Sequence, residues 1–136
     1  MPEAVIGGPR ECLILATDVE SAAPARLGAT LQADGLVATS RVEGGGGFQD
    51  LARFFRGLEQ EWRGWEGVRG WKSVEGDLGL VARHEFAHVR LTVTLRLQRF
   101  GWGNDGWSAT ADITVDPGEQ LSRAAWEIGA LVAGAE

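Results

Sequence analysis

Five consecutive residues have the types and spacing that could support metal chemistry. His84-Glu85-Phe86-Ala87-His88 match the H-E-x-x-H pattern of zinc peptidases, in which two histidines bind the metal and the glutamate acts as general base. That chemistry needs both histidines on one face of a helix, together with a third ligand from elsewhere in the chain. The first question is therefore whether this segment forms a helix.

The segment around the motif has the periodicity of a strand. From His88 onward, every second residue is apolar, at Val89, Leu91, Val93, Leu95 and Leu97. A helical stripe that starts at Leu78 would instead bury Glu85, Thr92 and Arg96. We therefore predict an antiparallel hairpin in which Ala82 pairs with Val89, Leu80 with Leu91 and Leu78 with Val93.

In this hairpin the motif lies in the connecting bend, where its histidines need not converge. Glu119, the nearest downstream candidate for a third ligand, is explained more simply as part of a helix start. We therefore expect no metal site and no catalytic residue. The alternative is a zinc-dependent hydrolase in which His84 and His88 bind zinc and Glu85 is the general base.

Length and composition predict a single domain, residues 1–136, with one core. The single cysteine, Cys12, cannot form an intramolecular disulfide, and its apolar surroundings predict burial. A net charge of -6 disfavours nucleic-acid partners, because neutralising phosphates needs a basic surface. Residues 1–10 lack a leader pattern, and no apolar run is long enough to span a membrane, so we expect a cytoplasmic protein without a membrane partner.

The alternation of apolar and polar residues predicts an α+β fold: an antiparallel, meander-like sheet of about six to seven strands with two helices on one face. Asp34-Gly35 is typical of a tight hairpin turn between strands at 27–33 and 36–42, and a strand at 11–19 precedes them. In the later strands, we expect Arg90 to lie opposite Asp116 and Thr94 opposite Asp112.

Two segments carry helical stripes. The first has apolar residues at steps of three and four and ends near Gly64: Phe48, Leu51, Phe55, Leu58, Trp62 and Trp65. The second begins at Asp116-Pro117-Gly118-Glu119, with an acid at the N-cap and proline at the first position. Trp126 falls opposite the buried stripe of this helix, so it is either covered by a loop or exposed as a contact surface.

The C-terminal half resembles a family of small bacterial proteins, found mostly in actinobacteria and known only as a domain of unknown function. The likeness is carried by Trp71 with Glu75-Gly76-Asp77, within the pattern W-x-S-x-E-G-D-L, and by Pro117-Gly118-Glu119-Gln120-Leu121. The resemblance implies a strand hairpin at residues 84–88, although Glu85-Phe86-Ala87 depart from the family's aspartate-glycine turn. It implies no activity.

These observations favour a non-catalytic binding or protein-interaction module. By analogy of fold, small acidic domains of this kind include toxin-neutralising immunity proteins. The candidate contact residues are Trp102, Trp126, Arg90 and Arg96, which are aromatic or arginine side chains of the types enriched at interfaces. The sequence leaves the partner and the oligomeric state open.

Overall fold

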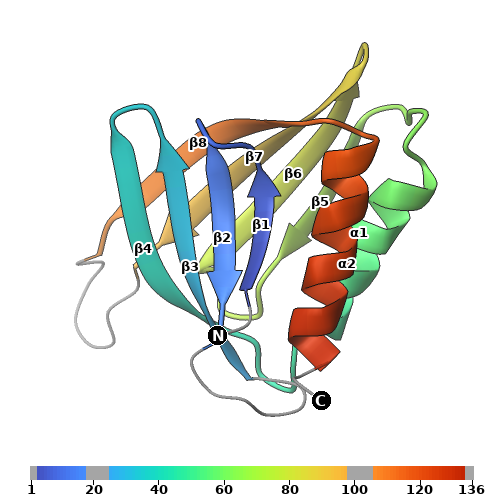
Figure 1. Cartoon of the computed structure of the whole chain (residues 1–136). Coiled ribbons are helices and arrows are strands. Elements are labelled where there is room, and N and C mark those ends of the chain that lie inside the picture. Colours follow the sequence, from blue (N-terminus) through green and yellow to red (C-terminus); the bar gives the residue numbers. More distant parts are fainter. Residues whose placement is uncertain (1–2, 18–24, 98–105, 134–136) are drawn as a thin grey trace.

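The computed structural model describes residues 3–17, 25–97 and 106–133, and it confirms the α+β class and both helices (Figure 1). In chain order the elements are β1 (Glu3–Gly7), β2 (Cys12–Ala16), β3 (Arg26–Ala33), β4 (Leu36–Glu43), α1 (Gln49–Gln60), β5 (Val68–Lys72), β6 (Leu78–Glu85), β7 (His88–Arg96), β8 (Ser108–Val115) and α2 (Glu119–Ala133).

The strands form two four-stranded antiparallel sheets, whereas the alternation predicted one sheet of six or seven strands. Sheet A has the order β1-β2-β3-β4 and sheet B the order β5-β6-β7-β8, so each is a meander. A helix follows each sheet, and the chain therefore runs twice through four strands and a helix. We call residues 3–60 the first half and residues 68–133 the second half.

Two features of this architecture cannot be predicted from the alternation of apolar and polar residues. β1, which precedes the first predicted strand at 11–19, has only five residues and ends at Gly7, too few to show a clear period. In addition, the pattern of a strand indicates which face is buried but not which sheet the strand joins.

One apolar core is shared by both sheets and both helices. Every strand except β5 contributes buried residues, such as Leu13 and Leu15 of β2 and Leu91 and Val93 of β7, while α1 contributes Leu51, Phe55 and Leu58. The two helices pack against each other on one side of the molecule, and α2 also packs along β1 (Figure 1). A fully buried leucine or phenylalanine contributes about 1.5 to 3 kcal/mol, so this common core is the main source of stability.

The observed registers of sheet B differ from the predicted ones by two residues. Glu85 pairs with His88, which leaves only Phe86-Ala87 in the turn. The pairs are consequently Ala82 with Leu91, Leu80 with Val93 and Leu78 with Leu95, and in the next ladder Arg90 with Thr114 and Thr92 with Asp112. A shift of two residues keeps every side chain on its face, so alternation alone cannot detect it.

In sheet A, the turn prediction is confirmed: Ala33 pairs with Leu36, and Gly35 has φ 78°.

The helix boundaries also differ from the sequence prediction. α1 ends at Gln60, so Trp62 and Trp65 lie beyond it. At the start of α2, the side chain that accepts the backbone N–H of the capping residue Asp116 comes from one residue later than predicted. Asp116 accepts a hydrogen bond from the Gly118 N–H at 3.3 Å, while the side chain of Gln120, and not that of Glu119, accepts the Asp116 N–H at 2.9 Å.

A buried carboxylate fastens the two sheets together at one end. Asp77, 5% exposed in the turn between β5 and β6, accepts hydrogen bonds from the Ser73 hydroxyl and from the Glu43 N–H at the end of β4, the latter at 3.3 Å. The Ser73 hydroxyl oxygen in turn accepts the Leu78 N–H at 3.0 Å. A buried charge is tolerated only when it is hydrogen-bonded, so this turn is held in one arrangement.

The tip of the β6–β7 hairpin has the opposite character. Phe86 has φ 56° and its side chain is fully exposed, at 101%. Left-handed backbone is unfavourable for a residue with a side chain, and glycine is the usual residue at such turn positions. Neither burial nor backbone preference therefore explains Phe86, which lies in the turn between β6 and β7. The β6–β7 hairpin extends beyond the rest of the molecule (Figure 1).

We expect Asp77→Ala to lower the free energy of unfolding by about 2 to 3 kcal/mol, because it leaves the Ser73 hydroxyl and the Glu43 N–H without an acceptor. Urea denaturation measures this change. The exposed Glu66→Ala removes the same charge and should change stability by no more than about 0.5 kcal/mol. Equal stabilities for the two variants would show that apolar packing alone joins the sheets.

Phe86→Gly should raise the free energy of unfolding by about 0.5 to 1 kcal/mol, because it relieves the left-handed backbone and removes no buried surface. Ala87→Gly is the matched control, since Ala87 does not have a positive φ and the change only adds freedom to the unfolded chain. Thermal or urea unfolding compares the two. A loss of stability in Phe86→Gly would mean that the ring makes a stabilising contact.

Candidate functional site

The hairpin places the residues of the H-E-x-x-H motif on two different faces of sheet B. His84 shares the inner side of β6 with Ala82, whereas Glu85 and His88 are paired across the hairpin on the outer side. The two histidines therefore point in opposite directions and do not converge on a common point. Among the described residues, no group of three or more histidines, cysteines, aspartates and glutamates is arranged to hold a metal ion.

His84 instead contacts the segment that connects α1 to β5. Its Nε2–H donates to the Trp62 carbonyl at 3.0 Å, because a carbonyl can only accept, and its ring meets Trp65 edge-on with centroids 5.3 Å apart. Arg69 strengthens this region through two hydrogen bonds to Glu61, at 2.7 and 2.8 Å. These bonds hold the pKa of the Glu61 carboxyl below its usual value.

Cys12 is buried, as predicted. Its thiol donates to the Gln32 side-chain oxygen across a distance of 3.7 Å, and burial raises the pKa of the thiol. A raised pKa disfavours the thiolate, which is the nucleophilic form.

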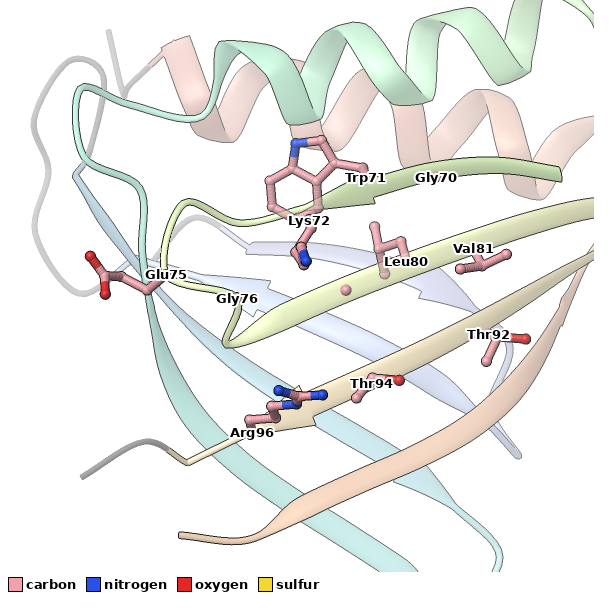
Figure 2. A pocket seen from close by; sticks show the side chains of 11 residues that line it. Gly70, Trp71, Lys72, Glu75, Gly76, Leu80, Val81, Thr92, Thr94 and Arg96 are labelled. Carbon is pink, nitrogen blue, oxygen red and sulfur yellow. The ribbon is translucent and has the colours of Figure 1, made fainter. Parts of the chain in front are cut away.

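A hollow of about 670 Å³ lies on the outer face of sheet B. It is lined by residues of β5, β6 and β7 and of the β5–β6 turn, among them Gly70, Lys72, Gly79, Val81, Thr94 and Arg96. Figure 2 shows that Lys72 comes from β5 and Arg96 from β7, with the strand β6 between them and Thr94 and Thr92 farther along β7.

Two of the residues that line this hollow are strand glycines, and neither position is too crowded for a side chain. A Cβ atom added to Gly79 would meet nothing within 4 Å, and one added to Gly70 would make only an ordinary contact, at 3.7 Å, with the Leu80 carbonyl oxygen. Neither glycine has a positive φ. Glycine weakens the interior of a strand, and there it commonly marks a place where a ligand or another backbone approaches closely.

The charges on this face are only partly neutralised. Arg90 is held by Glu85 at 3.1 Å and by Asp112 at 3.8 Å, and Asp112 also accepts the Thr92 hydroxyl at 2.6 Å. Lys72 and Arg96 form no ion pair with any residue that the structure describes. The lining of the hollow therefore carries two cations, Lys72 and Arg96, and one carboxylate, Glu75, in a protein whose net charge is -6.

The structure distributes the predicted contact residues over separate places. Arg96 lines the hollow, and Arg90 lies on the same face but in its ion pairs. Trp126 is 74% exposed on the outer side of α2, so no loop among the described residues covers it. Trp102 lies outside the described residues.

Sequence reasoning missed Lys72, Gly70 and Gly79 as site residues. The sequence feature that could have identified them is a glycine at an outward-facing position in each of two neighbouring strands, Gly70 in β5 and Gly79 in β6.

A family model described as a family of unknown function, DUF6228, matches residues 9–135. The chain belongs to this family. The match covers nearly all of both halves, so the DUF6228 family likeness extends well beyond the C-terminal motifs. Neither the curated proteins nor the solved structures gave a match. In the described part of this DUF6228 protein, no helix has the length and apolar character to cross a membrane.

We expect the two histidines of the motif to behave differently on substitution. His84→Ala should lower the free energy of unfolding by about 1 kcal/mol, because the Trp62 carbonyl loses its donor and Trp65 its ring contact. His88→Ala, on the exposed outer side, should change it by less than about 0.5 kcal/mol. Unfolding with and without added zinc is the measurement. A zinc-dependent gain in stability that both substitutions abolish would contradict the separation of the histidines.

Proposed function

We propose that this protein is a non-catalytic binding module that contacts a protein partner through the outer face of sheet B. The observation that carries the proposal is the hollow at Gly70 and Gly79, where two strand glycines leave open space that the fold does not need. A surface shaped by missing side chains is suited to receive side chains from another molecule.

The chemistry of the lining supports binding more than catalysis. It offers the Lys72 ammonium and the Arg96 guanidinium, which donate hydrogen bonds to anionic groups, whereas the Thr92 hydroxyl already donates to Asp112. Among the described residues, the lining contains no histidine or cysteine, because Cys12 is buried in sheet A and His84 faces the inner side of sheet B. Thiol and histidine chemistry therefore has no group among these lining residues, and the titratable groups here are Lys72, Glu75 and Arg96.

Charge indicates the kind of partner. Lys72 and Arg96 form no ion pair within the described chain and outnumber the one carboxylate of the lining, Glu75, so an acidic surface is complementary to the hollow. An immunity protein, which covers the surface of a toxin, is one instance of this class. Arg90 lies on the same face in ion pairs with Glu85 and Asp112, and Trp126 on α2 is a separate candidate contact.

Site-specific photo-crosslinking in the source cells tests this function. We expect Val81→p-benzoylphenylalanine, which places the reactive group in the hollow, to form a discrete protein adduct. The same replacement at Val37, which is 72% exposed on the outer face of sheet A, is the matched control and should form none. Lys72→Glu combined with Arg96→Glu should abolish the Val81 adduct. No adduct at Val81, or an equal one at Val37, would rule out this face as the contact surface.

A further inference from the structure

Two sheets with free edges present four edge strands, and at each edge alternate residues direct their backbone N–H and C=O groups away from the sheet. Carboxylates satisfy such groups at three edges. The Val5 N–H of β1 donates to Glu127 at 2.9 Å, the Thr114 N–H of β8 donates to Glu11 at 3.0 Å, and the Glu43 N–H of β4 donates to Asp77 at 3.3 Å.

β5 is the fourth edge. The Ser73 N–H donates to the Leu78 carbonyl at 2.9 Å, and the same alternation turns Arg69 and Trp71 toward β6. The backbone groups of Val68, Gly70 and Lys72 therefore point outward. No side chain or backbone group of the described residues bonds to them outside the sheet.

These outward groups are also accessible. Val68, Gly70 and Lys72 are all exposed. Because Gly70 has no side chain, its exposure is that of the backbone itself. The short length of β5 and the charge of Lys72 limit indiscriminate pairing, and they leave the edge open to a partner that charge selects.

We propose that β5 receives an extended acidic segment of the partner protein as an additional strand of sheet B. This inference rests on the proposed function and specifies how the partner reaches the outer face. In such strand addition, backbone hydrogen bonds supply affinity and alternate side chains supply specificity. Every second side chain of the added strand lies beside Gly70 and Lys72, at the rim of the hollow, where a carboxylate neutralises the Lys72 ammonium.

A second copy of the chain fits the edge less well. Two β5 strands could pair antiparallel around Gly70, but an edge of five residues contributes little of the ~1,200 to 2,000 Å² that stable interfaces bury. Antiparallel pairing around Gly70 would also place Val68 of one copy opposite Lys72 of the other and supply no carboxylate there, whereas an acidic peptide meets the local cations Lys72 and Arg96.

Selection of peptides from a random displayed library on the full-length protein tests the proposal. Gly70→Pro removes the central outward N–H without removing a hydrogen bond to β6, and Gly70→Ala is the control that keeps the N–H. We expect enriched peptides to carry aspartate or glutamate at alternate positions. They should bind wild type and Gly70→Ala alike and bind Gly70→Pro about tenfold or more weakly.

A second measurement does not depend on the proline variant. Binding of a selected peptide to the wild-type protein should slow hydrogen exchange at the Gly70 and Lys72 amides and leave the outward Val37 amide of β4 unchanged. Several results would overturn strand addition: no enrichment, enrichment of basic peptides, equal binding to Gly70→Pro, or protection of these amides by self-association without peptide.

The two proposals can fail separately. Adducts at Val81 together with peptides that ignore Gly70→Pro would retain the outer face as the contact surface and discard strand addition. Absence of adducts at Val81 would discard the proposed function itself, whatever peptides the library yields.

Discussion

The unpaired backbone of strand edges is the constraint on which this structure depends. A sheet that does not close on itself leaves N–H groups at both edges, and this fold has two such sheets. Glu127, Glu11 and Asp77 each accept one of these N–H groups. In every case the carboxylate comes from one half of the chain and the N–H from the other. The halves therefore complete each other through hydrogen bonds as well as through their common core.

The bonds made by these carboxylates determine which charges remain unpaired on the outer face of sheet B. Three carboxylates are committed to the seams between the halves, and Glu85 and Asp112 are committed to Arg90. At the hollow on the outer face of sheet B, the cations Lys72 and Arg96 consequently outnumber the carboxylate Glu75, although the whole protein is acidic. Binding chemistry at this face follows from how the charges are distributed and cannot be inferred from the net charge alone.

Local patterns in the sequence correctly predicted which side chains share a face of a sheet, but they did not predict which residues pair across neighbouring strands. The alternation from Leu78 to Leu97 correctly assigned the inner side of the central hairpin, because a period of two determines which side chains share a face. Register was missed because a shift of two residues preserves that pattern, and it is the two-residue turn at Phe86-Ala87 that decides it. The hollow was missed for a different reason. It is formed by absent side chains at Gly70 and Gly79, and their surroundings come from three strands.

The chain's twofold succession of four strands and a helix has a consequence for assembly. All three carboxylate contacts cross between the halves, so the second half of one molecule could satisfy the first half of another with the same contacts. Such an exchange is domain swapping, and its hinge would be the segment 61–67. The bonds of Glu61 to Arg69 and of His84 to Trp62 fold this hinge back onto sheet B. The contacts around the supposed metal motif thus favour closure within a single chain.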